Sequence, residues 1–196
     1  MAGMAPLVNF GDIKMEVTLI IVDNFYVDPD AVRAFALQQD FSVKGNFPGA
    51  RTKSFFTNDV KEAIEHNMQF AGKITNAYES SGYTGSFQLA TAQDRTWIHS
   101  DPYNMWAGVC YLTPDAPYTA GTGLFRHKAT GQCRKETQDW EGYDYTKYDM
   151  IDRIGNKYNR LIIYRGDLFH ASLDYFGDNL QNGRLFQTFF FDTERK

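Results

Sequence analysis

Two histidines, one aspartate and one arginine stand in an order that can assemble a metal centre with an anion site beside it. His99 and Asp101 are one residue apart, so in an extended chain both side chains point to the same side and can reach one ion. His170 lies in a turn that leads into an apolar strand, and Arg184 begins another. A His-x-Asp pair alone is more typical of a hydrogen-bonded loop histidine. The combination with His170 and Arg184 is what indicates a functional site.

Two imidazoles and one carboxylate can occupy one face of an octahedral ion and leave three positions open. That ligand set suits non-haem Fe(II) oxygenases. A bidentate 2-oxo acid can take two of the open positions, and dioxygen can take the last. Arg184 is the first residue of an apolar strand, and burying its guanidinium there would be costly unless it meets an anion. A guanidinium can donate two parallel hydrogen bonds to a carboxylate, so a carboxylate is the expected anion. We therefore predict that His99, Asp101 and His170 bind the metal and are catalytic.

The remaining two of the four histidines fit this site less well. His66 stands among polar neighbours in an expected helix, which predicts a surface position. His127 is the only rival third ligand, but it stands between Arg126 and Lys128. Two basic neighbours are more typical of a residue at the rim of a pocket than of a metal ligand.

Composition narrows the class of protein. The length of 196 residues favours one domain spanning residues 1–196. The net charge of -4 argues against nucleic acid as a partner. Cys110 and Cys133 do not form a disulfide framework and are expected to be reduced thiols. The start of the chain lacks the pattern of a signal peptide, and the apolar run at residues 19–22 is too short to cross a membrane. We expect a cytoplasmic protein without a membrane partner, either a monomer or a homodimer.

The elements that must position the site are mainly strands. Asp28 and Pro29 predict the start of a first helix, and Asn58 predicts the cap of a second helix over residues 60–74. Short aromatic and β-branched segments between polar turns, without a βαβ rhythm, favour a sandwich, barrel or jelly roll with the N-terminal helices buttressing one face, an α+β arrangement that is mainly β. The expected strands cover residues 15–22, 86–91, 95–98, 105–112, 121–126, 160–164, 167–172 and 184–191.

Two segments are open to more than one interpretation. Residues 129–157 are polar and too long for a simple connection, so they form either a mobile lid or a packed insert. The aromatics in this segment, Trp140, Tyr143, Tyr145 and Tyr148, can contact a substrate or pack the insert onto the barrel. Residues 45–51 are expected to be a loop, whose Arg51 faces either the substrate or solvent.

The ordered set His99-Ser100-Asp101, His170 and Arg184 resembles the 2-oxoglutarate/Fe(II)-dependent dioxygenase superfamily, whose fold is a double-stranded β-helix, the cupin-like jelly roll. Within it the chain is most similar to the prolyl-hydroxylase-like branch. Tyr111-Leu112-Thr113-Pro114 resembles the strand after the His-x-Asp motif, and the spacing of Arg184, Thr188 and Phe190 matches the last core strand. The resemblance covers roughly residues 87–192.

The resemblance implies the roles of further residues. Arg184, Tyr111 and Thr188 would bind 2-oxoglutarate, and Arg126 and Tyr103 would contact the substrate. The cofactors would be Fe(II), 2-oxoglutarate and dioxygen, with ascorbate as a reductant in vitro. The reaction would hydroxylate a C–H bond of an amino acid, peptide or small metabolite and release succinate and CO2. Asp101 favours hydroxylation, because the related halogenases lack this carboxylate.

Two features depart from the superfamily. The interval of 14 residues from His170 to Arg184 is long, and residues 129–157 match no branch. The N-terminal part, with Val22-Asp23-Asn24-Phe25 and Phe47-Pro48-Gly49, resembles small oxygenase-like proteins of bacteria and phages whose substrates are unassigned. Two alternatives stay open: a non-catalytic jelly-roll protein that binds sugar or peptide, and a cupin-type isomerase or simple dioxygenase that would not need Arg184.

Overall fold

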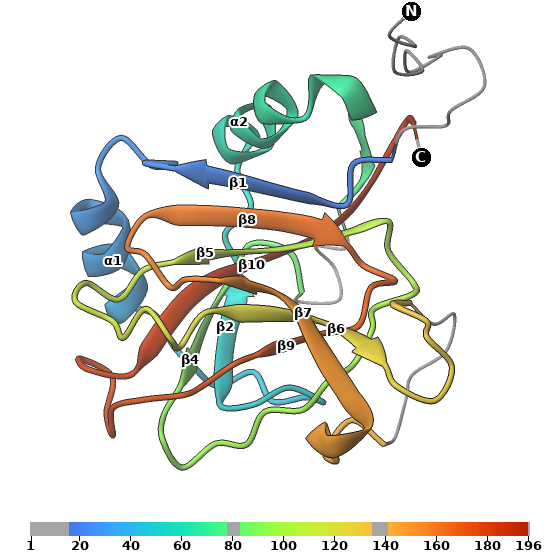
Figure 1. Ribbon diagram of the computed structural model, residues 1–196. Helices are drawn as coiled ribbons and strands as arrows, with labels where there is room; N and C mark the ends of the chain where they lie inside the picture. Colours follow the sequence, from blue (N-terminus) through green and yellow to red (C-terminus); the bar gives the residue numbers. More distant parts are fainter. Residues whose placement is uncertain (1–15, 78–82, 135–140, 196) are drawn as a thin grey trace, which may run out of the picture.

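Two antiparallel sheets face each other in the computed structural model, which describes residues 16–77, 83–134 and 141–195 (Figure 1). The larger sheet has the order β1-β8-β5-β10-β4-β2, with β3 paired to β10, and the smaller has the order β7-β6-β9. This arrangement confirms the predicted jelly roll. The strands are β1 Leu19–Asp23, β2 Ala50–Ser54, β3 Ile74–Asn76, β4 Ser86–Ala90, β5 Trp106–Tyr111, β6 Thr122–His127, β7 Tyr148–Ile154, β8 Arg160–Arg165, β9 His170–Ser172 and β10 Arg184–Thr193.

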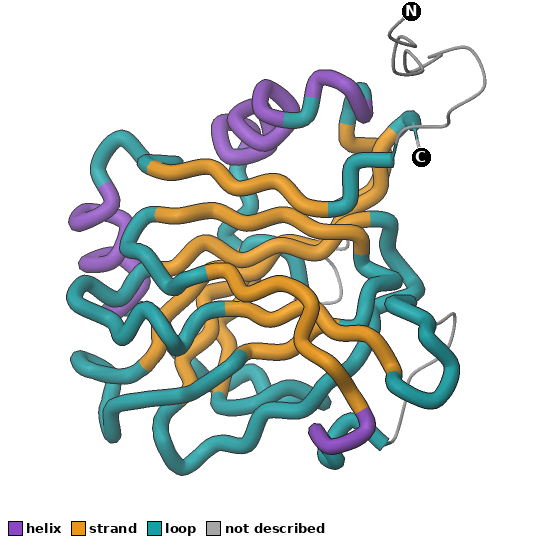
Figure 2. The backbone as a smooth tube through the Cα atoms, viewed as in Figure 1, coloured by secondary structure: helices purple, strands orange, loops and turns teal. Residues whose placement is uncertain are grey.

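The central strand β10 lies between β5 and β4 in the larger sheet, and it is buried on both faces because the helices cover one face and the smaller sheet covers the other. Its alternation sends Leu185, Phe189 and Phe191 into the core beneath the helices. The other face sends Phe186 and Phe190 toward the space between the two sheets. Figure 2 shows the strands of both sheets running across the molecule around this space.

The two N-terminal helices pack against the outer face of the larger sheet, as predicted. Helix α1, Pro29–Leu37, begins where the Asp28 carboxylate accepts a hydrogen bond from the Ala31 backbone amide at 2.9 Å. Helix α2 is Asn58–Asn67, and its cap is Thr57 rather than the predicted Asn58. It is also shorter than predicted, because a 3-10 turn at Gln69–Ala71 follows and Gly72 adopts a positive φ of 79° before β3.

The strand prediction was wrong at three segments. Residues 95–98 form no strand. Isolated hydrogen bonds connect them to neighbouring segments, such as that from the Ile98 amide to the Gly142 carbonyl at 2.9 Å. Strand β2 was not predicted, and its first two residues were placed in the expected loop over residues 45–51, yet pairing with β4 buries Arg51 and Thr52. Strand β7 lies within the segment 129–157 and reads as polar because it is an edge strand with exposed side chains. Residues 135–140 of that segment, including Trp140, lie outside the described residues.

Smaller expectations are also resolved by the structure. His66 is exposed near the end of α2, as predicted, and Cys110 and Cys133 are both free. Within the described ranges, no helix is long and apolar enough to cross a membrane.

The fully buried Phe189 provides a test of the core. Its ring lies near Phe25 and Phe56 at centroid distances of 6.4 and 6.3 Å. We expect Phe189→Ala to lower the free energy of unfolding by about 3–5 kcal/mol, because it removes a large apolar side chain and leaves a cavity. Urea denaturation checks this, with Tyr118→Ala as a control at a side chain that is 65% exposed. An unchanged unfolding midpoint in Phe189→Ala would contradict the assigned packing.

The pairing of β1 with β8 predicts a contribution to acid stability. The Asp23 carboxylate contacts Arg160 at 2.7 Å and Lys157 at 2.8 Å, and hydrogen bonds from both hold its pKa well below its ordinary value of 3.8. A carboxyl whose pKa is depressed by folding stabilises the protein above its unfolded pKa and loses that effect as the pH falls further. We expect Asp23→Asn to lower stability at pH 7 by about 1 kcal/mol or less, since the group is partly exposed, and to lower it less near pH 2, which lies below the ordinary pKa and approaches the depressed pKa of the folded state. Thermal unfolding at both pH values measures the difference.

Candidate metal centre

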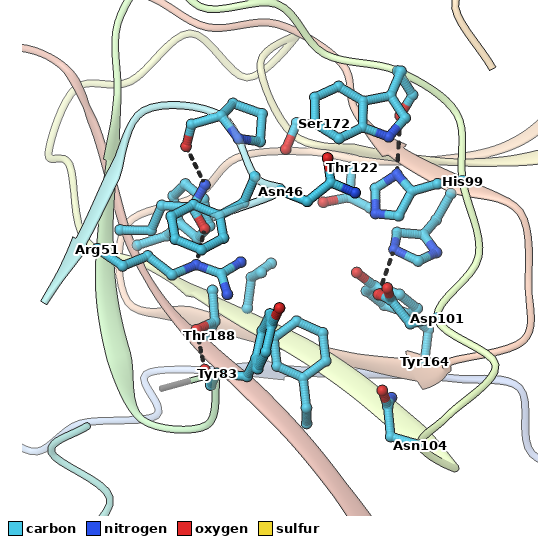
Figure 3. Close-up of a pocket in the computed structure, with 18 of the residues that line it drawn as sticks. Asn46, Arg51, Tyr83, His99, Asp101, Asn104, Thr122, Tyr164, Ser172 and Thr188 are labelled. Atoms are coloured by element: carbon cyan, nitrogen blue, oxygen red, sulfur yellow. Dashed lines mark hydrogen bonds and ion pairs between the residues drawn. The ribbon is translucent and has the colours of Figure 1, made fainter. Parts of the chain in front are cut away.

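His99, Asp101 and His170 meet at one point between the two sheets. One potential ligand atom from each lies within 4.8 Å of the others, and the structure shows no other such group among the described residues (Figure 3). His99 and Asp101 precede β5, and His170 is the first residue of β9. The backbones of His99 and His170 exchange two hydrogen bonds of 2.9 and 2.8 Å, which join the His-x-Asp segment directly to β9. The two segments are therefore fixed relative to each other before any metal binds.

The tautomers of both histidines are set by backbone carbonyls. Nδ1 of His99 lies 3.0 Å from the Trp97 carbonyl oxygen, and Nδ1 of His170 lies 2.8 Å from that of Leu168. A carbonyl oxygen only accepts, so each Nδ1 carries the proton and donates it. The Nε2 lone pair of each ring is then available to a cation. This is the arrangement in which protein histidines usually bind metals.

The electrostatics of the cluster suit a cation. Burial and the neighbouring His170 lower the pKa of His99 to about 4, so the imidazole is neutral at pH 7. Burial alone would raise the pKa of Asp101, but its interactions with His170, His99 and Arg51 outweigh burial and lower the pKa. Oδ2 of Asp101 lies 3.3 Å from Nε2 of His170. A neutral His99 and an ionised Asp101 are thus present together at neutral pH.

The cluster lies in the wall of a cavity of about 370 Å³, within the usual range of small-molecule sites. Both sheets contribute to the wall, and aromatic rings make up much of it. The lining side chains include the three candidate ligands together with Asn46, Phe47, Arg51, Tyr83, Gln88, Trp97, Tyr103, Asn104, Val109, Thr122, Tyr164, Ser172, Tyr175, Phe186, Thr188 and Phe190.

Arg184 is fully buried behind one part of this wall and does not line the cavity itself. Its guanidinium donates to the Ala120 and Gly121 carbonyls at 3.1 and 3.3 Å, and to the Ser172 hydroxyl at 2.7 Å. Ser172 does line the cavity. The positive charge of Arg184 therefore lies one side chain away from the cavity.

Of the other residues predicted to bind 2-oxoglutarate or substrate, some line the cavity and others do not. Tyr111 is fully buried, with its hydroxyl 2.7 Å from that of Thr122 in the cavity wall. Thr188 and Tyr103 line the cavity, although the Thr188 hydroxyl already donates to the Tyr83 carbonyl at 2.6 Å. Arg126 lies outside it, exposed and paired with Asp149 at 2.9 Å.

His127, the rival third ligand, is not part of the metal cluster. It lies at the end of β6, with Nδ1 3.1 Å from the Thr130 hydroxyl. Gln88, which the sequence did not indicate as a site residue, is buried in the wall and hydrogen-bonded to Arg51. Gln88 shares one face of β4 with Ser86 and Ala90. Its hydrogen-bond partner Arg51 is brought to it by the pairing of β2 with β4.

Comparison with known proteins shows the family of the chain. Residues 6–147 match a family of unknown function, DUF6445. The chain belongs to this family. The matched region contains His99 and Asp101 and ends before His170 and Arg184. No curated protein matches the chain significantly.

Solved structures show that this member of DUF6445 has the fold of 2-oxoglutarate oxygenases. HygX from Streptomyces hygroscopicus, with nickel and 2-oxoglutarate bound, aligns at a TM-score of 0.60 and 9% identity, covering 90% of this chain and 83% of HygX. The same protein with hygromycin B also bound aligns at 0.60 and 10% identity, with the same coverage. A prolyl hydroxylase from Trichoplax adhaerens, in complex with a peptide fragment of hypoxia inducible factor, aligns at 0.49 and 13% identity over 90% of this chain and 84% of that one.

Proposed function

We propose that the protein is an Fe(II)- and 2-oxoglutarate-dependent oxygenase that hydroxylates a C–H bond of an amino acid, peptide or small metabolite. The observation that carries the proposal is the convergence of His99, Asp101 and His170, with both imidazoles held in the metal-binding tautomer. The fold shared with HygX, which binds nickel and 2-oxoglutarate, supports it. The overall reaction would convert 2-oxoglutarate, dioxygen and R–H into succinate, CO2 and R–OH.

The donor set fits the proposed metal. Fe(II) accepts nitrogen and carboxylate oxygen ligands, and two histidines with one carboxylate leave open positions for a cosubstrate and dioxygen. When bound, iron and 2-oxoglutarate would supply the oxidising chemistry, which is the cofactor's own contribution. Asp101 is deprotonated at neutral pH, because its pKa is lowered by its interactions with His170, His99 and Arg51. It would therefore bind a cation without first losing a proton.

The cavity wall would orient the reactants and exclude water. Tyr164 packs against His170 at a ring-centroid distance of 4.6 Å, and Trp97 lies 5.8 Å from His99. These rings hold the imidazoles in place and keep the surroundings of the ligands apolar. A site that excludes water also protects a reactive oxidant from side reactions.

Arg184 would hold the distal carboxylate of 2-oxoglutarate from behind Ser172 and Thr122. Its guanidinium is fixed by two backbone carbonyls, so its charge is oriented in advance. The Ser172 hydroxyl accepts from Arg184 and faces the cavity, where it can turn its own proton toward a carboxylate. Tyr111 would contribute through Thr122, since the two hydroxyls are hydrogen-bonded.

A succinate-release assay tests the proposed function. The purified protein is incubated with Fe(II), ascorbate and 2-oxoglutarate over a panel of amino acids and peptides. We expect succinate to form only when both Fe(II) and 2-oxoglutarate are present, and faster with a substrate than without one. If succinate stays at the level of the protein-free control throughout, the proposed function is contradicted.

A further inference from the structure

A second buried arginine, Arg51, lies in the cavity wall itself. Arg51 is only 5% exposed and belongs to β2, which pairs with β4. Figure 3 shows its guanidinium pointing into the cavity from the side opposite His99 and Asp101. Arg184 does not line the cavity and contacts the lining residue Ser172 instead, whereas Arg51 lines the cavity directly.

Arg51 is held in place by two neighbours. Its Nε donates to Oε1 of Gln88 at 2.7 Å, and the Gln88 amide in turn donates to the Pro48 carbonyl at 2.7 Å. The ring of Phe47 covers the guanidinium at 4.0 Å from its centroid. The loop that carries Phe47 is tied down by the Gly49 amide, which donates to Asp94 at 3.0 Å. The guanidinium is therefore fixed on one edge and one face before any ligand arrives.

The remaining edge of the guanidinium lacks a partner. Nη1 is buried and has no hydrogen-bond partner among the residues that the structure describes, and no ion pair within those residues involves Arg51. Burial lowers the pKa of Arg51 to about 10, so the group remains charged at neutral pH. Leaving a buried charged donor unpaired is costly unless a ligand satisfies it. The negative charge of Asp101 acts on Arg51 across the cavity, but that carboxylate is the proposed metal ligand.

We propose that Arg51 binds a carboxylate of the primary substrate and so makes the enzyme selective for carboxylic acids. This inference rests on the proposed function, because it assigns the second anion site of the same cavity. 2-Oxoglutarate has only one carboxylate distant from the metal, and the proposed function assigns that group to Arg184. Arg51 is left for a different anion.

The surroundings of Arg51 also restrict the body of that substrate. The ring centroids of Tyr83 and Phe190 lie 5.3 and 5.7 Å from the guanidinium carbon of Arg51. Trp97 also lines the cavity, near His99. These rings favour an apolar body between the carboxylate and the C–H bond that reacts. The cavity of about 370 Å³ must also hold 2-oxoglutarate, so only a small acid, or the C-terminal residue of a peptide, would fit.

Matched acids and amides test this assignment. The probes are the N-acetyl derivatives of the twenty proteinogenic amino acids, each as the free acid and as the primary amide. Binding to the anaerobic protein loaded with Fe(II) and 2-oxoglutarate is measured by calorimetry. We expect at least one acid to bind roughly 10- to 100-fold more tightly than its amide, as the loss of a charge-assisted hydrogen bond implies.

Variants then assign the difference to Arg51. Arg51→Gln should abolish the preference for the acid while the dissociation constant of 2-oxoglutarate changes less than about twofold. Lys53→Gln is the matched control, because it removes one positive charge from the same strand at an exposed position outside the cavity. It should retain the full preference. Arg51→Lys keeps the charge but not the planar pair of donors, so it should lose most of the preference even if Arg51→Gln folds poorly.

The outcomes separate this inference from the proposed function. If the protein with Fe(II) does not bind 2-oxoglutarate, the proposed function fails. If 2-oxoglutarate binds but no acid is preferred over its amide, or Arg51→Gln and Arg51→Lys retain the preference, the inference about Arg51 is overturned. A large loss of 2-oxoglutarate affinity in Arg51→Gln would overturn it as well, because Arg51 would then hold the cosubstrate.

Discussion

Replacing Asp101 by alanine is expected to abolish succinate formation and to weaken metal binding by more than about 100-fold. The carboxylate is the only anionic ligand in the candidate centre, so the variant would leave only the two imidazoles. Loss of a residue that merely orients a metal ligand typically weakens affinity by about 10- to 100-fold, and loss of a ligand should cost more. Metal content after dialysis and the succinate assay measure the two effects.

The fold of this variant should survive, which makes the result interpretable. Asp101 lies 3.3 Å from His170, and both imidazoles keep their carbonyl partners when the carboxylate is removed. Asp59→Ala removes an exposed carboxylate from the start of α2 and serves as the control. If Asp101→Ala still decarboxylates 2-oxoglutarate at the wild-type rate, the three-ligand assignment is wrong.

Replacing Arg184 by alanine should have two large effects. The first is a loss of roughly 3–5 kcal/mol of stability, because a large side chain leaves a cavity in a fully buried site and the Ala120 and Gly121 carbonyls each lose one of two donors. The second is an increase of at least about 10-fold in the 2-oxoglutarate concentration needed for half-maximal rate, because the charge behind Ser172 disappears. Denaturant unfolding and the 2-oxoglutarate dependence of succinate release measure the two effects separately.

Arg184→Lys separates folding from cosubstrate binding. Lysine keeps the charge but cannot satisfy two carbonyls and a hydroxyl in a fixed plane, so both effects should be present but smaller. Arg153→Ala, at an exposed arginine on β7 with one hydrogen bond to the Thr119 carbonyl, should change neither quantity. If Arg184→Lys is folded and has an unchanged requirement for 2-oxoglutarate, Arg184 is a structural residue only.

The sequence predicted the class of fold and the members of the metal cluster for identifiable physical reasons. Strand β10 is so rich in aromatic and aliphatic residues between polar ends that a buried strand could be predicted without knowing its neighbours. Asp28 before Pro29 is a local capping signal, and the first helix began where it predicted. His99 and Asp101 share one side of the chain because they are separated by a single residue.

The errors arose where position depends on distant partners. Strand β2 is polar, and only its pairing with β4 reveals that Arg51 is buried against Gln88. Strand β7 presents exposed side chains and is a strand because β6 offers it an edge. Local propensity carries little of this information, since strand formation depends on the neighbours that a segment meets in the folded sheet.

The central claim is that His99, Asp101 and His170 form an Fe(II) site that accepts 2-oxoglutarate. Anaerobic titration of the Fe(II)-loaded protein with 2-oxoglutarate, followed by visible absorption, tests it most directly. The account predicts a weak charge-transfer band that grows to saturation near one equivalent of 2-oxoglutarate and is absent in Asp101→Ala. A wild-type protein that binds Fe(II) and 2-oxoglutarate without developing this band, or one that binds neither, would contradict it.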